Sequence, residues 1–292
     1  MQTKHQIHDL LSSAGIKPNK RLGQHFLIDL NLMRLLVDSA NIQKDDVVLE
    51  VGCGTGSMTE LLTERAGRTI AVELDRNLFE ISGKQLAQIQ TVELINADIL
   101  ENKHTINHLI TDALLRARKQ SNGRILLIAN LPYQVASPVM LNLLAGPTIA
   151  DGMYVTVQKE VAERMTALPA TPDYGVLSIF LHAVGDVKTI RTLKPTVFWP
   201  QPQVDSAMVS FVRNSRKIER IANMDVFSEI VHLFMGHRRK TLLACTKLAG
   251  EKLAPVLDWP RMLEQCGIDP GLRPDKLSAD DYIALSNYAA KT

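Results

Sequence analysis

The chain has 292 residues, of which 46% are apolar and 22% are charged, and its formal net charge is only +2. This composition is typical of a folded globular protein and excludes a disordered or low-complexity chain. Because the net charge is small, binding to a nucleic acid would depend on local clusters of Lys and Arg.

The cysteines and the apolar segments indicate the compartment. Cys53, Cys245 and Cys266 are widely spaced and form no pair typical of a zinc or redox site, so we expect no metal and a reducing environment. Residues 1–20 lack the apolar segment of a signal peptide. No run of about 18 apolar residues is present, and we therefore predict a cytoplasmic protein without a membrane segment.

The N-terminal arm, residues 1–27, begins with a polar stretch that we expect to be poorly ordered, apart from a short helical turn at 9–14. The arm ends in a basic and apolar segment, residues 20–27, that could lie over a cofactor pocket. It contains His25, although a single histidine is more often an ordinary surface residue. Residues 31–40 have helical periodicity and should pack on a sheet.

A glycine-rich turn follows the first predicted strand, residues 46–51. Gly52, Gly54 and Gly56 stand between this strand and a predicted helix at 57–65, which is the layout of a nucleotide site in a doubly wound sheet. The spacing is Gly-x-Gly-x-Gly, which argues against a dinucleotide and for a ligand without a pyrophosphate, such as S-adenosylmethionine. Close packing of a strand on a helix also selects glycine.

Acidic residues follow the next two predicted strands. Glu73 comes after residues 69–72, about 20 residues past the glycines, where an acid commonly accepts hydrogen bonds from ribose hydroxyls. Asp98 follows the strand at 92–95, and its carboxylate could accept from the adenine amine of the cofactor. For Asp98, a turn or helix N-cap residue is an equally good interpretation.

The strand at 124–129 leads into Asn130-Leu131-Pro132-Tyr133. Pro132 keeps Leu131 out of the helical region, so the Asn130 side-chain oxygen and the Leu131 carbonyl should both face outward as neutral acceptors. Two acceptors that grip the N–H groups of an exocyclic adenine amine would free its lone pair for attack, and the Tyr133 ring would stack on the purine. The alternative is a strand that simply ends in a proline turn.

Four strand ends thus carry ligand-type groups at one edge of the predicted sheet, where open α/β sheets bind their ligands. A helix at 137–144, a strand at 153–158 and a helix that opens at 159–164 follow, then two strands at 185–193 and 204–212 that we expect to pair antiparallel. The proline-rich segment between these two strands should be a stiff loop. Its Phe198 or Trp199 would close the second face of the base that stacks on Tyr133.

From about residue 213 the sequence turns to Arg, Lys and helical periodicity, which indicates a second domain. We expect Arg238, Arg239 and Lys240 on a helix at 226–248, where they would contact phosphates, although a solvated helical face is an equal alternative. The predicted domains are residues 1–213, for the cofactor, and residues 214–292, a helical domain that contacts RNA.

Taken together, the motifs resemble the ribosomal RNA small-subunit adenine dimethyltransferase family, from Lys20 to about Tyr288. The motifs that carry the resemblance are residues 21–27, 50–56, 73–75, 130–133, 158–161, 200–207 and 238–241. The chain departs from the usual family pattern at His25 and Gln134, where Asn is common, and at Cys53, where Pro is common.

The resemblance implies a Rossmann-like α/β sheet of the class I S-adenosylmethionine-dependent methyltransferases with a smaller C-terminal all-helical domain. It implies transfer of four methyl groups from S-adenosylmethionine to N6 of two adjacent adenosines near the 3′ end of small-subunit (16S) ribosomal RNA, late in subunit assembly. The target base must leave its stack to react. The expected partner is the ribosomal RNA of an immature small subunit, and we expect a monomer without an obligate protein partner.

By motif position, the resemblance assigns three groups of residues. Catalytic or base-holding roles are expected for Asn130, Leu131, Tyr133 and Phe198. Cofactor contacts are expected for His25, Leu27, Gly52, Gly54, Glu73, Asp98 and Asn130. Contacts with RNA are expected for Arg21, Arg238, Arg239 and Lys240.

Three other functions remain open from the sequence. The same chemistry could act on large-subunit ribosomal RNA, because target choice depends on shape that a sequence does not display. The basic cluster at 238–240 would also suit an assembly factor whose methylation is secondary. A DNA adenine methyltransferase is less favoured, since nothing resembles a DNA-specificity domain.

Overall fold

The computed structural model describes residues 1–19, 22–146, 149–253, 256 and 258–291. Contacts between its residues divide the chain into two units, Met1–Ala162 with Lys188–Val212 and Glu163–Val187 with Arg213–Thr292. The second unit thus includes residues 163–187, which the sequence pattern assigns to the first domain. In the described parts of the chain no helix is long and apolar enough to cross a membrane.

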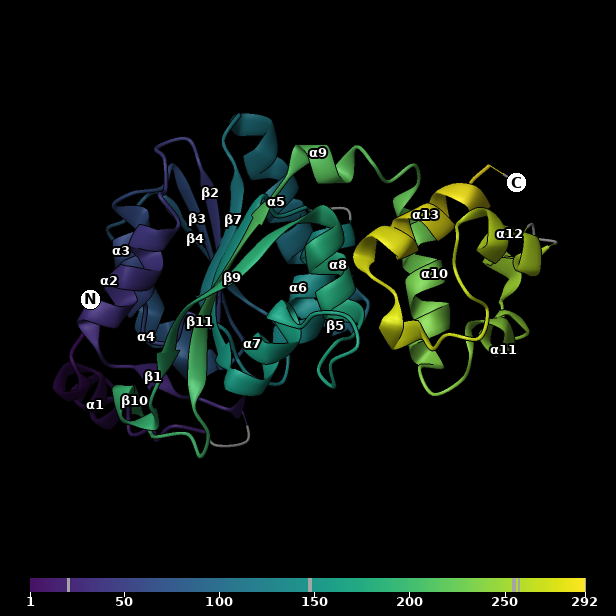
Figure 1. Ribbon diagram of the computed structural model, residues 1–292. Coiled ribbons are helices and arrows are strands. Elements are labelled where there is room, and N and C mark those ends of the chain that lie inside the picture. Colours follow the sequence, from purple (N-terminus) through teal and green to yellow (C-terminus); the bar gives the residue numbers. More distant parts are fainter. Residues whose placement is uncertain (20–21, 147–148, 254–255, 257, 292) are drawn as a thin grey trace. The chain divides into compact units, whose positions relative to one another are not determined.

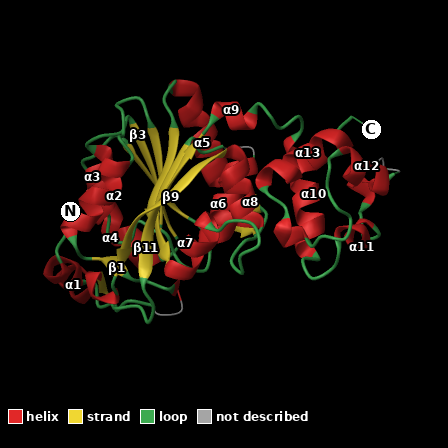
Figure 2. Ribbon diagram, viewed as in Figure 1, coloured by secondary structure: helices red, strands yellow, loops and turns green. Residues whose placement is uncertain are grey.

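The first unit is built on a seven-stranded sheet with strand order β4-β3-β2-β7-β8-β11-β9 (Figures 1 and 2). The neighbours from β4 to β8 pair in parallel, whereas β11 is antiparallel to β8. The strands of this sheet are β2 (Val47–Val51), β3 (Arg68–Glu73), β4 (Val92–Asn96), β7 (Ile125–Asn130), β8 (Gly152–Gln158), β9 (Gly185–Leu193) and β11 (Ser206–Arg213).

Helices α2 and α3 lie on one side of the sheet and α5 and α6 on the other (Figure 1). The helices that begin in this unit are α1 (Lys4–Ser13), α2 (Leu30–Ser39), α3 (Ser57–Thr63), α4 (Arg76–Leu86), α5 (His108–Gln120), α6 (Ala136–Ala145) and α7 (Lys159–Thr166). Two small two-stranded sheets complete it, one of β1 (Phe26–Leu27) with β10 (Phe198–Trp199) and one of β5 (Leu100–Asn102) with β6 (Thr105–Ile106).

Alternate residues of the central strands face the two helical layers, as the two-residue period of a strand requires. Val48, Leu126 and Ile128 join Leu36 and Leu62 in one buried cluster under α2 and α3. Since both faces of β2 and β7 are covered, these strands are apolar almost throughout, which is why the sequence reveals them as continuous apolar runs.

The predicted strands at 46–51, 69–72, 92–95, 124–129, 153–158 and 185–193 are confirmed to within two residues, and so are the helices at 31–40, 57–65 and 137–144. The prediction omits several elements, among them helix α4, the β5–β6 hairpin and helix α8 (Val176–Val184). The β5–β6 hairpin lies in a polar stretch without strand alternation. Helix α8 is apolar on nearly every face, so it has no helical periodicity to detect.

The N-terminal prediction is wrong in one respect, because residues 4–13 form a regular helix rather than a poorly ordered stretch. Thr3 caps α1: its hydroxyl accepts from the Gln6 N–H, and the Gln6 side chain accepts from the Thr3 N–H. Ile7 and Leu11, one turn apart, are buried against Leu78 of α4. Capping and this short apolar stripe stabilise a helix whose average composition is polar.

The segment 198–199 is also not the loop that its prolines predict. Phe198 and Trp199 form strand β10, which pairs antiparallel with β1 through Leu27↔Phe198 and Phe26↔Trp199. The Phe26 and Trp199 rings stack with centroids 6.2 Å apart. Sequence analysis misses this pairing because each strand has only two residues and the two lie far apart along the chain.

The second unit contains helix α8 and, after residue 213, further helices and 3-10 turns. The helices are α8, α9 (Ser215–Ile218), α10 (Met224–Gly236), α11 (Leu242–Thr246), α12 (Trp259–Gln265) and α13 (Ala279–Ala289). Phe180 of α8 meets Phe227 of α10 edge-on, with ring centroids 5.2 Å apart. This packing of α8 on α10 explains why residues 163–187 belong with the C-terminal helices.

The basic cluster Arg238, Arg239 and Lys240 is not on a helix, contrary to the prediction of a single helix at 226–248. Helix α10 ends at Gly236, and residues 237–240 form a turn. Thr241 then caps α11, its hydroxyl accepting from the Ala244 N–H. The sequence signals for this break are therefore a glycine and, five residues later, an N-cap threonine.

Candidate active site

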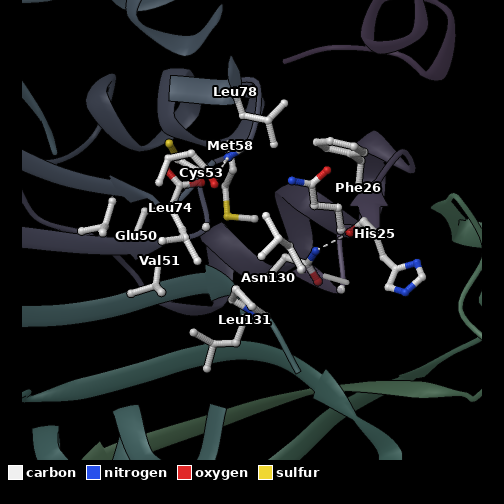
Figure 3. A pocket seen from close by; sticks show the side chains of 18 of the residues that line it. His25, Phe26, Glu50, Val51, Cys53, Met58, Leu74, Leu78, Asn130 and Leu131 are labelled. Carbon is white, nitrogen blue, oxygen red and sulfur yellow. Dashed lines mark hydrogen bonds between the residues drawn. The ribbon is translucent and has the colours of Figure 1, made fainter. Parts of the chain in front are cut away.

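A cavity opens at the carboxyl ends of β2, β3 and β7, within the first unit (Figure 3). Its volume is about 1250 Å³ when its open mouth is included. It is lined by the N-terminal arm, by the glycine turn and by the residues that follow β3, β4 and β7. The edge of the sheet at which the sequence predicts a ligand site therefore does carry a cavity.

The glycine turn has a backbone that only glycine adopts without strain. Gly52 and Gly54 have φ angles of 76° and 59°. A Cβ atom on Gly52 would come within 3.0 Å of the Pro132 ring, and one on Gly54 within 3.0 Å of the Phe26 ring. The turn is thus held close to the end of β7 on one side and to the N-terminal arm on the other.

Glu73 lies at the end of β3 and lines the cavity, as the ribose-acceptor prediction requires. Its two carboxylate oxygens accept from the N–H groups of Gly54, at 2.8 Å, and Asp75, at 2.9 Å. Burial raises the pKa of Glu73, whereas these backbone bonds oppose the rise. Each carboxylate oxygen has a further lone pair, so Glu73 can still accept from a ligand hydroxyl.

Asp98 also lines the cavity, but it is exposed and one of its oxygens accepts from the Leu100 N–H at 3.0 Å. Both interpretations of this residue therefore fit the structure, since Asp98 stabilises the turn after β4 and faces the cavity as well. The apolar side chains of Leu74, Leu78 and Ile99 line the same region. Together these residues offer apolar contacts and one carboxylate, which suit a purine with an exocyclic amine.

Asn130 is the last residue of β7, and a hydrogen bond determines which way its side-chain amide is turned (Figure 3). Its side-chain nitrogen, Nδ2, donates to the main-chain carbonyl of His25 at 2.8 Å. A carbonyl oxygen can only accept, so the other atom of the amide must be the oxygen Oδ1. Among the described residues Oδ1 is buried without a hydrogen-bond partner. An unpaired buried acceptor is unfavourable by about 1–3 kcal/mol, which a donor from a ligand would relieve.

Leu131 and Tyr133 stand beside Asn130 and line the same cavity. The Leu131 N–H donates to the Thr156 carbonyl at 3.1 Å, which extends the pairing of β7 with β8 past Asn130. The Tyr133 hydroxyl lies 2.9 Å from the Ser206 hydroxyl, and burial raises the pKa of Tyr133. The amide, the following backbone and the aromatic ring are thus brought together as predicted.

His25, which belongs to the N-terminal arm, contacts both Asn130 and Tyr133. Its ring stacks on Tyr133 with centroids 5.6 Å apart, and its Nδ1 lies 2.7 Å from the Pro200 carbonyl. Because that carbonyl can only accept, Nδ1 carries the proton. The ring points away from Asn130 in Figure 3. A direct contact between this ring and the cofactor stays a prediction.

Phe198 is not among the residues that line the cavity. A ring that closes over the base would be expected to line it. Its pairing with Leu27 directs it into the buried cluster that contains Met33 and Leu36, and only 1% of its surface is exposed. Leu27 itself is buried and also lines the cavity. In this arrangement Phe198 supports the wall of the site rather than facing a ligand.

Glu50 and Cys53 line the cavity, yet neither is among the predicted site residues. Burial raises the pKa of Glu50 to about 8; the Thr59 hydroxyl, which donates to it at 2.6 Å, opposes the rise, and the charge on Glu73 adds to it. Burial likewise raises the pKa of the Cys53 thiol. The detectable signal for Glu50 is a carboxyl group inside an otherwise apolar strand, which requires a reason to be there.

The predicted RNA contacts belong to the second unit and to the arm. Arg238, Arg239 and Lys240 are exposed, and Arg238 also donates to the Pro172 carbonyl at 3.3 Å. Arg21 lies outside the described residues. No group of three or more His, Cys, Asp or Glu side chains is placed to hold a metal ion in the described ranges.

The site's residues fit S-adenosylmethionine. The glycine turn lines the cavity, Glu73 can accept from ribose hydroxyls, and the Asn130 oxygen, which has no partner among the described residues, can accept from a ligand. The sheet has the order and the antiparallel β11 of class I methyltransferases. Fold and site together define the class: this is a Rossmann-like class I S-adenosylmethionine-dependent methyltransferase.

Sequence comparison narrows this class. The ribosomal RNA adenine dimethylase family matches residues 15–291, and the chain therefore belongs to that family. Two similar proteins are the ribosomal RNA small subunit methyltransferases A of Bacillus mycoides (strain KBAB4) and Bacillus cereus (strain AH187). Each is 34% identical over 288 residues, which is 98% of this chain and 96% of the relative.

Solved structures support the fold. A dimethyladenosine transferase from Plasmodium falciparum aligns over 90% of this chain and 96% of its own, with a TM-score of 0.68 and 21% identity. The 23S rRNA methyltransferase ErmE aligns over 91% of this chain and 99% of its own, with a TM-score of 0.62 and 21% identity. At this identity the likeness shows a shared fold and does not decide the target.

Proposed function

We propose that this enzyme uses S-adenosylmethionine to dimethylate N6 of two adjacent adenosines near the 3′ end of small-subunit (16S) ribosomal RNA. Its full-length relatives are small-subunit methyltransferases, which favours that target over the large subunit. The observation that carries the chemistry is the buried Oδ1 of Asn130, which has no hydrogen-bond partner in the described part of the chain and lies beside Leu131 and Tyr133 in one cavity.

Asn130 and Leu131 would activate the adenine amine by alignment. The amine has two N–H donors, one for the Asn130 oxygen and one for the Leu131 carbonyl. These hydrogen bonds draw the nitrogen toward tetrahedral geometry, so its lone pair leaves the ring system and becomes available for attack. When bound, S-adenosylmethionine supplies an electrophilic methyl group. The transfer leaves an extra proton on the amine, which it can release to solvent, so no general base is needed.

Tyr133 would hold the flipped base. Stacking on an aromatic ring contributes about 1–3 kcal/mol per base, and the hydrogen bond with Ser206 fixes the tyrosine in place. Extrusion of the base costs a few kcal/mol and least in an unpaired region, so we infer that the target adenosines lie in a loop or at a weakly paired end.

Residues at the ends of the other strands would bind the cofactor. Glu73 would accept from the ribose hydroxyls and Asp98 from the adenine amine, while Gly52 and Gly54 permit close approach of the backbone. Leu27 gives an apolar wall. His25 accepts the Asn130 amide with its main-chain carbonyl, and as a residue that lines the cavity it would also contact the cofactor.

The cluster of Arg238, Arg239 and Lys240 would bind the ribosomal RNA phosphates of an immature small subunit, together with Arg21. Three exposed cations in one turn suit a phosphate backbone, which gives affinity without sequence specificity. We further propose that the enzyme acts late in small-subunit assembly, in the cytoplasm and as a monomer.

The test is to incubate the purified protein with S-adenosylmethionine and small ribosomal subunits that lack adenine dimethylation. Nucleoside mass spectrometry then measures N6-methylated and N6,N6-dimethylated adenosine. Dimethyladenosine on two adjacent positions near the 3′ end supports the proposal. Its absence there, with cofactor binding intact, or its appearance only on large subunits, would overturn the assignment of the target.

A further inference from the structure

Gln2 is buried against Thr55 and Ser57, two residues that line the cofactor cavity, although glutamine is usually exposed. Only 6% of its surface is accessible. Its side-chain nitrogen donates to the Thr55 carbonyl at 3.1 Å, and its side-chain oxygen accepts from the Thr55 hydroxyl at 2.6 Å. Its backbone N–H donates to the Ser57 hydroxyl at 2.7 Å. One residue of the N-terminal arm thus makes three hydrogen bonds to the glycine turn and the start of α3.

The first part of the turn is fixed by the sheet, since the Gly52 and Cys53 N–H groups donate to the Val72 carbonyl and the Gly54 N–H to Glu73. Gln2 contacts the end of the turn, at Thr55 and Ser57. Gly56 is the N-cap of α3 and, having no side chain, makes no capping hydrogen bond. Glycine has the largest conformational freedom of all residues, so a turn with three of them in five positions loses much entropy when it becomes fixed. The two-point contact of Gln2 with Thr55 instead ties the residue before this N-cap to the N-terminal arm.

The rest of the arm is attached to α4 and to the residue before it. Ile7 and Leu11 pack against Leu78 and Ile81 of α4, and Ile7 also lines the cavity. Further along, the Gln24 side chain donates to Asp75 at 2.9 Å. The arm therefore runs from the glycine turn to α4, and one of its apolar side chains forms part of the cavity wall.

We propose that Gln2 is a positioning residue for cofactor binding, which holds the glycine turn in its binding conformation through Thr55 and Ser57 before the cofactor arrives. Fixing a site in advance raises affinity because the binding step no longer includes the ordering of the loop. Gln2 would act through the turn and would not touch the reacting atoms. This inference rests on the proposed function only in that the cavity binds S-adenosylmethionine.

The first measurement needs no cofactor. Hydrogen exchange of the backbone amides at residues 53–58 is compared between the wild-type protein and Gln2→Ala, both with a C-terminal tag so that the first residues are unaltered. We expect faster exchange in this segment of the variant and unchanged exchange in the central strands. Equal exchange at 53–58 in the two proteins would overturn the proposal, whatever the enzyme's substrate is.

The second measurement is the affinity for S-adenosylhomocysteine by calorimetry. Loss of the buried hydrogen bonds should weaken binding by roughly tenfold in Gln2→Ala. In kinetics the KM for S-adenosylmethionine should rise by a similar factor, with kcat and the KM for the small subunit unchanged. A merely structural defect would instead lower the fraction of active protein and therefore the apparent kcat.

Two further variants sharpen this comparison. Thr55→Val removes the hydroxyl that donates to the Gln2 side chain. Because both substitutions remove this same hydrogen bond, the loss of affinity in the double variant should be smaller than the sum of the two single losses. Lys4→Ala, in the same arm and exposed, should bind like the wild type. If the wild type binds S-adenosylhomocysteine and Gln2→Ala binds it equally well, the role of Gln2 is refuted. If the wild type itself does not bind, the proposed function fails instead.

Discussion

The side-chain nitrogen of Asn130 donates to the main-chain carbonyl of His25, a residue 105 positions earlier in the chain, at 2.8 Å. This contact fixes which end of the amide faces the cavity. The oxygen is left as a buried acceptor without a partner among the described residues. Because the partner is a backbone carbonyl, this orientation does not depend on the identity of the His25 side chain.

Asn130→Ala should remove most of the methyl transfer. The variant loses one of the two acceptors that align the adenine amine, and a positioned polar group of this kind contributes about 100-fold or more to the rate. Affinity for S-adenosylhomocysteine should fall far less than the rate. Single-turnover methylation of small subunits measures the loss. Asn77→Ala, on the exposed surface, is the matched control; a rate for Asn130→Ala near that of the control would contradict the alignment mechanism.

Gly52→Ala should destabilise the protein and weaken cofactor binding. Its φ angle of 76° is unfavourable for alanine, and the new methyl group would lie 3.0 Å from the Pro132 ring. We expect a loss of about 1–3 kcal/mol in the free energy of unfolding. Urea denaturation measures this loss.

Gly236→Ala is the control for this substitution. A Cβ atom at Gly236 meets nothing within 4 Å, and the residue lies at the end of α10. Because alanine favours the helix, this variant should be as stable as the wild type or more stable by about 0.5–1 kcal/mol. Equal destabilisation by the two substitutions would show that strain at Gly52 is not the cause.

Glu50 should make the free energy of unfolding fall as the pH rises. Its pKa is about 8 in the folded protein, because of burial, against an ordinary value of 4.5. Between these two values the folded protein retains a proton that the unfolded chain releases, so stability decreases with pH.

Glu50→Gln keeps the shape and the neutral form, and therefore should lose this dependence. Relative to the variant, the wild type should lose about 2–3 kcal/mol of unfolding free energy between pH 6 and pH 9. Urea denaturation at both pH values measures it, with the exposed Glu64→Gln as the control. Parallel pH profiles for the wild type and Glu50→Gln would mean that Glu50 is ionised in the folded protein.

Replacement of Arg238, Arg239 and Lys240 by alanine should weaken binding to small subunits and leave cofactor binding unchanged. Each phosphate contact contributes about one unit to the slope of log affinity against log salt, so the slope should fall by about 2–3. Binding measured across salt concentrations tests this, with the exposed Arg216→Ala as the control. An unaltered slope would exclude this turn from the RNA interface.

Much of the sheet can be predicted because its central strands, β2, β3, β7 and β8, are buried on both faces and form mainly apolar runs that end in distinctive residues. The four strand ends at Gly52, Glu73, Asp98 and Asn130 were predictable for the same reason, since parallel strands bring their carboxyl ends to one edge. What each side chain does there depends on partners far away in the chain. The bond from Asn130 to His25 has no local signal at all.

The errors have the same physical origin. The proline-rich segment was expected to be a loop, yet Phe198 and Trp199 form a two-residue strand and Phe198 is buried in the core. Its contact with the base stays a prediction. Gln2 is polar and lies in a polar stretch, so only the structure reveals that it is buried against Thr55. Short pairings and buried polar contacts are decided by tertiary packing, which local propensity does not report.

The pairing of β1 with β10 also affects the time at which the site can form during synthesis. The wall at His25–Leu27 is closed by residues 198–200, through the strand register and the contact of the His25 ring with the Pro200 carbonyl. All of the predicted cofactor contacts lie within the first 130 residues. Two of them, His25 and Leu27, are held in place by residues 198–200, which the ribosome adds much later. We expect a nascent chain to acquire affinity for the cofactor late, after β10 has left the exit tunnel.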